Sequence, residues 1–447
     1  MKIHLLIGAL AISLLAWTQI LFAQTLPQPV HIPDNQVNLM DYGAVADGQT
    51  LNTQAFEKAV SALNKKGGGH LLVPEGLYLT GPIVLKDAID LHLERGAVIL
   101  FSPDKALFRN NGSTRPGISA SKKHDVSISG EGIIDGNGAF WRPVKRSKVS
   151  DVEWKDYLAL GGEVTEDGSL WYPFHLNGYE NLTDDARAEE KLRTHLVRFT
   201  ACERVSVTGV TLQNSPKFHL VPQRCRDVTI EDVTVRCPWN AQNGDGIDLM
   251  QCERVVVRRC TVDVGDDGIC LKGGAGAKAL QDGPCKDILI EHNTVYRAHG
   301  GFVIGSEFSA GMENITVRHN VFSGTDVGLR FKSAPERGGK TVNVRISDIV
   351  MNGIRDEAIS FETAYADRPA GHEDNQAAQT RSFLPDFQDI VMERITCWGA
   401  KTGIHAQGNL EMIHDIILRD AVLYVQKGTK IDVPQMISLE NVKITEY

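Results

Sequence analysis

The sequence has 447 residues, a formal net charge of −9, 42 glycines and an aromatic content of only 7%. The negative charge argues against a nucleic-acid partner, because neutralising phosphates requires a basic surface. For the same reason, an acidic substrate would depend on local cations rather than on the overall field. The many glycines are typical of a fold with many tight turns.

Residues 1–23 have the pattern of a signal peptide. Lys2 gives a positively charged start, an apolar run follows from Leu5 to Phe22, and Ala23 fits the position before the cleavage site. An uncleaved membrane anchor is the alternative. No other apolar run approaches the roughly 20 residues that a membrane span needs. The sequence thus predicts export to the periplasm or the medium, with residues 24–447 as one mature domain.

The eight cysteines allow disulfides, because an exported protein meets an oxidising compartment. None of them forms a CxxC pair or a cysteine–histidine zinc pattern. Four of them begin copies of one repeated phrase, namely Cys202, Cys225, Cys252 and Cys285. We therefore favour small buried side chains that stack on one another over disulfide bonds.

Residues 53–65 predict an amphipathic helix, with Phe56, Val60 and Leu63 on one face and an Asn-Thr pair at the start as a candidate cap. Three glycines at 67–69 end it, and strands follow. The helix would cover one end of a repeat stack, whose strand edges would otherwise be unpaired.

A short phrase recurs from residue 124 onward, in which one polar residue precedes alternating apolar residues. Its copies begin at Asp125, Arg204, Asp227, Arg254, Asp287, Asn314, Asn343, Asp389 and Asp415. Each copy is too short to bury its apolar face alone, so neighbouring copies must stack. Because no helices separate the copies, the pattern favours an all-β parallel β-helix over βαβ units.

Two stretches interrupt this rhythm. Residues 141–192 contain Trp141, Trp154 and Trp171 together with a charged run, and residues 363–385 form the second stretch. Both predict loops inserted on the side of the stack, where binding residues often lie.

Four polar clusters fall in the middle of the repeats. They are Asn243-Gly-Asp245-Gly-Ile-Asp248, Gly265-Asp266-Asp267-Gly, Ala298-His299-Gly300-Gly301 and Arg330-Phe-Lys332. The steps from Asp245 to Asp267, to His299 and to Arg330 are 22, 32 and 31 residues, which match the length of one coil. Neighbouring coils would bring these side chains about 4.8 Å apart per strand, into one cleft.

These residue types suit hydrolysis of a glycosidic bond, which needs an acid for the leaving oxygen and a base for water. Close carboxylates repel one another, so one pKa is expected to rise and leave a protonated acid. Arg330 and Lys332 share one face of a strand and could pair with a substrate carboxylate. Taken singly, each cluster could be an ordinary turn, loop or solvated face; their joint spacing favours a site.

The clusters resemble those of glycoside hydrolase family 28, the polygalacturonases and related pectin hydrolases. The family's Asn-Thr-Asp, Gly-Asp-Asp, Gly-His-Gly and Arg-Ile-Lys correspond to Asn243-Gly244-Asp245, Gly265-Asp266-Asp267, Ala298-His299-Gly300 and Arg330-Phe331-Lys332. Three positions depart from the family pattern without removing a titrating group, namely Gly244, Ala298 and Phe331. The phrase Gly-Leu-Arg-Phe-Lys is similar to the bacterial, often exo-acting members.

The resemblance implies a right-handed parallel β-helix and single-displacement hydrolysis with inversion. It assigns the general acid to Asp266 and the activation of water to Asp245 and Asp267. His299 would support the acid or the substrate. No cofactor or metal is implied by this mechanism.

The resemblance also implies that Asn243, Arg330 and Lys332 bind the galacturonate of a pectic poly- or oligosaccharide. The insertion at residues 141–192 would close one end of the cleft, so that a monomeric, exported enzyme removes terminal sugars. One alternative is a hydrolase of another pectin linkage, in a rhamnogalacturonan backbone or side chain. Others are a Ca²⁺-dependent pectate lyase, with Arg330 as base, and a non-catalytic binding module.

Overall fold

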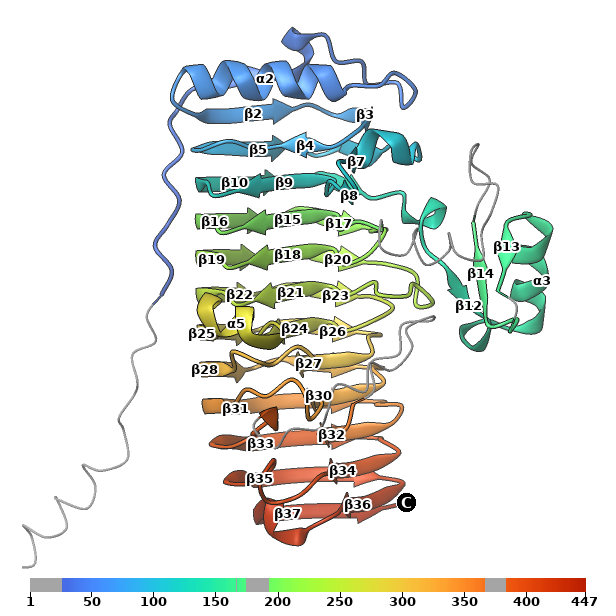
Figure 1. Ribbon diagram of the computed structural model, residues 1–447, viewed down its shortest axis with the longest axis vertical. Helices are drawn as coiled ribbons and strands as arrows, with labels where there is room; N and C mark the ends of the chain where they lie inside the picture. The colour runs from blue at the N-terminus through green and yellow to red at the C-terminus, as the bar shows by residue number, and fades with distance from the viewer. Residues whose placement is uncertain (1–25, 166, 174–192, 366–382) are drawn as a thin grey trace, which may run out of the picture.

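The computed structural model describes residues 26–165, 167–173, 193–365 and 383–447, so the predicted signal peptide lies outside the described residues. The chain winds as a right-handed parallel β-helix whose coils lie above one another along one axis (Figure 1). The predicted fold class is therefore confirmed. None of the described helices is long and apolar enough to cross a membrane.

One face of the β-helix is an 11-stranded parallel sheet. Its strands, in stacking order, are β4 (Ile83–Val84), β9 (Ile118–Ser121), β15 (Val197–Thr200), β18 (Leu220–Gln223), β21 (Ile247–Met250), β24 (Ile269–Lys272), β27 (Gly300–Ile304), β30 (Val327–Lys332), β32 (Glu357–Glu362), β34 (Thr402–Gln407) and β36 (Lys427–Ile431). This sheet carries the polar clusters.

The remaining faces belong to a 21-stranded sheet that contains two stacks of strands. One stack comprises β1 (Gln36–Asn38), β2 (Gly69–Val73), β5 (Ile89–Leu93), β10 (His124–Gly130), β16 (Glu203–Thr208), β19 (Arg226–Glu231), β22 (Glu253–Arg258), β25 (Cys285–Glu291), β28 (Met312–Arg318), β31 (Thr341–Asn352), β33 (Ile390–Trp398), β35 (Ile416–Val425) and β37 (Ile437–Glu446). The other comprises β3 (Gly76–Thr80), β6 (Ala97–Phe101), β11 (Ile133–Asp135), β17 (Thr211–Gln213), β20 (Thr234–Arg236), β23 (Thr261–Asp263), β26 (Thr294–Tyr296) and β29 (Val321–Ser323), and both stacks meet in β31.

The core is a set of apolar columns that run through the interior. In the 11-stranded sheet one column consists of Val197, Leu220, Ile247, Ile269, Phe302, Leu329, Ile359 and Ile404, each paired with the next. All of them are buried. Because side chains alternate between the two faces of a strand, the residues between these positions point outward, away from the core.

The polar residue that opens each repeated phrase has a structural explanation. In all nine copies it adopts the left-handed conformation, with φ between 49 and 57°. Asp and Asn tolerate this region better than most residues. Where Arg occurs instead, its guanidinium is fixed by the preceding coil: Arg204 pairs with Asp125 and Arg254 with Asp227. The phrase therefore marks the point where each coil turns.

The predicted helix is α2 (Thr53–Lys65), which lies at the N-terminal end of the stack (Figure 1). Phe56, Val60 and Leu63 are buried, as expected. The expected cap is wrong, because the Asn52 side chain makes no capping bond. It bonds instead to the backbone N and O of Val45, at 2.7 and 3.0 Å, and so fastens the preceding loop.

All eight cysteines are free thiols, which confirms the preference for stacking over disulfides. Cys225, Cys252 and Cys285 are buried on successive coils. Their thiols donate to carbonyl oxygens of the coil before, at 3.4, 3.3 and 3.3 Å respectively.

The first interruption forms a small unit beside the coils (Figure 1). It contains β12 (Val144–Lys145), β13 (Glu163–Val164) and β14 (Leu170–Tyr172), which pair antiparallel, and α3 (Asp151–Ala159). Two further short elements are α5 (Gly276–Asp282) and the hairpin of β7 (Arg109–Asn110) with β8 (Ser113–Thr114). Much of the predicted second insertion lies outside the described residues.

Candidate active site

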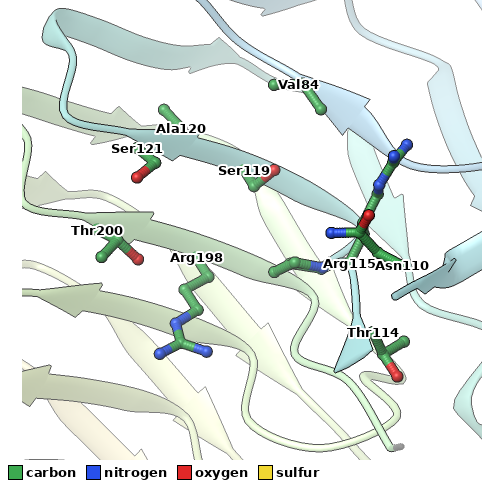
Figure 2. Close-up of a pocket in the computed structure, with 10 residues that line it drawn as sticks. Val84, Asn110, Thr114, Arg115, Ser119, Ala120, Ser121, Arg198 and Thr200 are labelled. Atoms are coloured by element: carbon green, nitrogen blue, oxygen red, sulfur yellow. The ribbon is translucent and has the colours of Figure 1, made fainter. Parts of the chain in front are cut away.

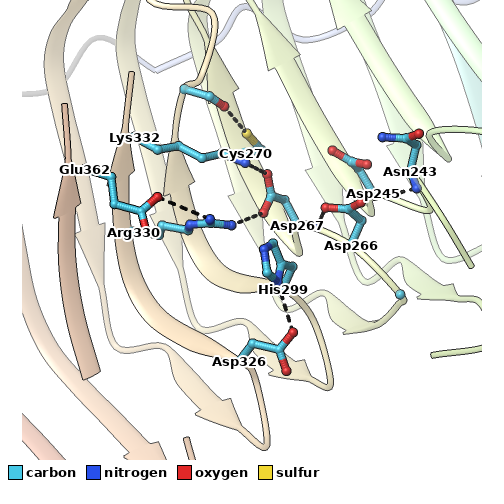
Figure 3. Close-up of polar contacts among 12 residues, drawn as sticks. Asn243, Asp245, Asp266, Asp267, Cys270, His299, Asp326, Arg330, Lys332 and Glu362 are labelled. Atoms are coloured by element: carbon cyan, nitrogen blue, oxygen red, sulfur yellow. Dashed lines mark hydrogen bonds and ion pairs between the residues drawn. The ribbon is translucent and has the colours of Figure 1, made fainter. Parts of the chain in front are cut away.

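The three candidate catalytic carboxylates meet where the chain enters the 11-stranded sheet (Figure 3). Asp245 and Asp267 stand on adjacent coils, because the backbone N of Gly246 donates to the Asp267 carbonyl at 2.9 Å. One oxygen each from Asp245, Asp266 and Asp267 lies within 4.8 Å of the others. Asp245 and Asp267 are buried, whereas Asp266 is half-buried.

The Asp266 carboxylate is oriented by backbone groups. Its two oxygens accept hydrogen bonds from the backbone N–H of Asn243, at 3.2 Å, and of Asp267, at 3.0 Å. The Asn243 side chain points elsewhere, since its Oδ1 accepts from Arg193 at 2.7 Å. The backbone of Asn243 thus positions the candidate acid, while its side chain is held by Arg193.

His299 lies beside the carboxylates and is anchored on two sides. Its backbone N donates to the Asp266 carbonyl at 2.9 Å. Its Nδ1 lies 2.9 Å from an Asp326 oxygen, while more than a third of the side chain remains exposed. Asp326 fixes the orientation of the ring, so Nε2 is the nitrogen available to the cleft.

Arg330 and Lys332 enter the same cluster from β30. Lys332 Nζ lies 2.8 Å from Asp267 Oδ2, and Arg330 Nη1 lies 3.7 Å from Asp267 Oδ1. Arg330 Nη2 also lies 3.4 Å from Glu362. Both side chains are about 95% buried, and the Tyr365 ring covers them at 5.3 and 4.9 Å.

A second buried lysine, Lys272, also belongs to this cluster. The sequence analysis did not single it out as a site residue. Lys272 Nζ lies 3.8 Å from Asp245, 3.4 Å from Asp248 and 3.7 Å from Glu307. The sequence does contain a pattern that could have indicated Lys272. In Cys270-Leu-Lys272, as in Arg330-Phe-Lys332, an apolar residue separates two outward-facing positions. The strand register aligns these two triplets, so both lysines lie in one column.

Burial sets the protonation of the carboxylates. Burial, and then the charges of Asp248 and Asp266, raise the pKa of Asp245 well above its ordinary value. Burial also raises the pKa of Asp248 to about 7, although Lys272 opposes it. Burial alone would raise the pKa of Asp267, but Lys332 and Arg330 hold it well below its usual range.

The expected rise in one pKa falls on Asp245, to which the family resemblance assigns water activation. The physical reason is enclosure, since Asp245 is buried in the sheet entrance next to Asp248. The cluster therefore sets a carboxyl with a raised pKa, Asp245, beside one whose pKa the neighbouring cations hold low, Asp267. Such divergence between neighbouring groups is typical of acid–base sites.

Several polar atoms at the centre have no hydrogen-bond partner among the described residues. They are Asp245 Oδ1, both carboxylate oxygens of Asp248, Asp267 Oδ1 and the Nε and Nη1 atoms of Arg330. Buried polar atoms are normally paired, so these atoms are placed to meet water or substrate. The three carboxylates could also surround a cation, but Lys272 and Lys332 already supply positive charge there.

Residues 157–405 match the sequence profile of the family described as glycosyl hydrolases family 28. This match spans more than half of the sequence. The chain belongs to glycosyl hydrolases family 28. Membership in this hydrolase family sets aside the lyase and the non-catalytic alternatives, and identifies the protein as a glycoside hydrolase.

Individual enzymes and one solved structure are moderately similar to this chain. The exo-poly-alpha-D-galacturonosidase of Dickeya chrysanthemi is 30% identical over 74% of this chain, which spans only 57% of that enzyme's length. An endo-polygalacturonase of Pectobacterium carotovorum is 27% identical, with 78% of each chain covered. The solved structure of an exopolygalacturonase from Thermotoga maritima superposes with a TM-score of 0.78 at 28% identity and covers 94% of both chains.

Removing the charge of Lys272 should move the pH dependence of this family 28 hydrolase. Lys272→Met takes away a cation that favours the ionised forms of Asp245 and Asp248, so the pKa values of both rise further. If Asp245 must be ionised to activate water, the acid limb of kcat/KM shifts to higher pH by about one unit. Lys272→Arg keeps the charge and should restore the limb. A lower kcat with an unmoved limb would show that Lys272 acts only on packing.

Proposed function

We propose that the protein is an exo-acting polygalacturonase, which cleaves terminal α-1,4-galacturonosidic bonds of pectin. The observation that carries this proposal is the buried pair of Arg330 and Lys332 beside three carboxylates. Arg330 Nε has no hydrogen-bond partner among the described residues and can donate to a carboxylate, and Lys332 adds a point charge beside it. A substrate carboxylate would be a further partner for these two buried cations beside Asp267 and Glu362, whereas a neutral sugar would make no use of their charge. The names of the Dickeya and Thermotoga relatives agree with the proposal.

In the proposed mechanism, Asp266 gives its proton to the leaving glycosidic oxygen. A water molecule held by Asp245 and Asp267 attacks the anomeric carbon as that bond breaks, and one of these carboxylates accepts the water's proton. Half-buried Asp266 faces the cleft and can exchange its proton with solvent afterwards. Asp267 suits the role of base, because Lys332 and Arg330 hold its pKa low and keep it ionised.

The stereochemistry of the product tests this mechanism. The closest carboxylate oxygens lie within 4.8 Å, whereas inverting glycosidases usually separate their two carboxyl groups by about 6.5–9.5 Å. We still expect inversion, because here two carboxylates, Asp245 and Asp267, hold the attacking water between them. In most inverting enzymes a single, more distant base holds it. Proton NMR during hydrolysis should show the β-anomer first, before mutarotation. The α-anomer appearing first would indicate a covalent intermediate and overturn the assignment.

Exo action requires that one end of the cleft is closed. Two bordering features support this part of the proposal. Tyr365 covers the cation pair at one end. The inserted unit approaches from the side, where Lys148 Nζ donates to the Gly265 carbonyl at 2.9 Å. A sugar chain would then enter with its end against Tyr365.

A timed product analysis tests the activity. With polygalacturonic acid and a chelator, purified protein should release saturated monogalacturonate as the first product, and Asp266→Asn should reduce kcat by about 100-fold or more. Circular dichroism of the variant controls for folding. A ladder of oligomers would overturn exo action. Cleavage of rhamnogalacturonan but not of polygalacturonic acid would replace the substrate.

We also propose that the enzyme is exported as a monomer of residues 24–447, after removal of the signal peptide. The pattern of residues 1–23 supports the export, and the described coils offer one continuous core. Native mass spectrometry of protein from the exported fraction should give one copy that begins at Gln24. A retained leader or a dimer mass would contradict this part.

A further inference from the structure

A buried histidine lies on the core side of the sheet, directly behind the catalytic carboxylates. His219 immediately precedes β18 and is completely buried, and the proposed mechanism gives it no role. In the strand register, its position corresponds to those of Gly246, Gly268 and Gly301 in the next three coils. A Cβ placed at Gly268 would lie 2.6 Å from Val295, a core residue, so this position faces the interior. An imidazole there must have polar partners, because burying it without them is costly.

Both ring nitrogens of His219 have such a partner. Nδ1 lies 2.8 Å from the backbone carbonyl oxygen of Asp245, and the backbone N of Ser215 donates to Nε2 at 3.2 Å. Burial lowers the pKa of His219 to about 4, so the ring is neutral at neutral pH. Because Nε2 accepts, the neutral ring carries its proton on Nδ1 and donates it to Asp245. The backbone N of His219 donates to the same carbonyl at 3.0 Å, so this oxygen accepts two hydrogen bonds from one residue.

The Asp245 carboxylate depends on this anchor of its main chain. Asp245 Oδ1 has no hydrogen-bond partner among the described residues. Lys272 Nζ lies 3.8 Å from Oδ2, which is too far for a hydrogen bond. By contrast, the Asp267 carboxylate accepts a hydrogen bond from Lys332 at 2.8 Å. The position of the Asp245 carboxylate is therefore set by the place at which its backbone is held.

The other side of the His219 ring is attached to a loop that two buried arginines fix. Ser215 is completely buried, and its carbonyl oxygen accepts from Arg142 Nη1 at 2.5 Å. Arg193 Nη1 donates to the carbonyl oxygen of the next residue, Pro216, at 3.2 Å. Both arginines are more than 90% buried. The ring thus connects a fixed loop to the main chain of Asp245.

His219 lies on the opposite side of the sheet from the surface that is open to a substrate. Figure 2 shows a pocket of about 310 Å³ on the outward face of β9 and β15, whose lining includes Ser119, Arg198 and Thr200. His219 belongs to the next coil, yet its ring is buried on the core side and lines no part of this pocket. Any effect of His219 on the reaction must therefore pass through Asp245.

We propose that His219 is a positioning residue, which fixes the main chain of Asp245 so that its carboxylate meets the attacking water. The inference rests on the proposed function, because it takes Asp245 as one of the two carboxylates that hold the water. A misplacement of a reacting group by about 1 Å can lower the rate about 100-fold. Loss of the Nδ1 contact should therefore reduce kcat and leave KM unchanged.

Two substitutions separate the two contacts of the ring. His219→Asn retains an N–H close to the Nδ1 position but loses the acceptor for Ser215, whereas His219→Gln retains that acceptor but loses the donor to Asp245. We expect kcat of His219→Gln to be lower than that of His219→Asn by about tenfold or more, with KM values within about twofold. Thermal unfolding measures the stability of each variant. The matched control is His92→Gln, which removes a histidine contact to Ser129 on β5 and β10. Equal kcat values for the two His219 variants, or kcat values that follow the melting temperatures, would overturn the inference.

A double-mutant cycle with Asp245 separates the two proposals. Because His219 acts through Asp245, His219→Gln should lower the residual rate of Asp245→Asn protein by less than about twofold. An undiminished loss in that background would overturn the inference. The assay uses the polysaccharide that the wild type is found to cleave. If this is not a galacturonan, the proposed function falls while the cycle still tests His219. If a galacturonan is cleaved and His219→Gln is as active as the wild type, only the positioning role falls.

Discussion

The active site depends on the hydrogen-bond register between adjacent coils. Asp245 and Asp267 are 22 residues apart in the sequence, and only the parallel pairing of their coils makes them neighbours. A slip of one residue would turn every outward side chain of that strand into the core. The inward apolar column and the left-handed residue at the start of each phrase both oppose such a slip. The same features that stabilise the coil therefore set the geometry of catalysis.

The second constraint is the cost of burying charge. Asp245, Asp248 and Asp267 would each be expensive to bury alone. Lys272 and Lys332 offset this cost from the same sheet, at distances of 2.8 to 3.8 Å. The positive charge is shared unequally among the three carboxylates, and this inequality gives them different pKa values. Two cations next to Asp267 hold its pKa low, whereas Asp245 shares one lysine with two other carboxylates and its pKa is raised.

Much of the architecture could be predicted from the sequence, because it depends on local sequence patterns. Residues 53–65 show the helical period, the nine phrases show the coils, and four clusters at coil spacing show the cleft. Interactions between residues that meet only in the folded protein could not be predicted from such patterns. Nothing in the neighbouring sequence indicates that Asn52 bonds to Val45 or that Tyr365 covers Arg330.

The sequence also could not predict which of the carboxyl groups has the raised pKa. Repulsion predicts that the pKa of one carboxyl rises, and enclosure by the sheet decides that it is the pKa of Asp245. Lys272 is the instructive intermediate case. Its alternation with Cys270 repeats that of Lys332 with Arg330, yet the equivalence becomes visible only when the strands are aligned.

A parallel sheet converts a repeat in sequence into a row of binding positions. Each coil contributes one outward side chain per column, at a spacing close to that of the coil before and after. On this face the columns carry cations at β15, β24 and β30, although the protein as a whole is negative. The overall field cannot attract an acidic polymer, so recognition must come from these desolvated contacts at short range. A linear polyanion, the substrate class proposed above, is a ligand whose own repeat can follow such a row.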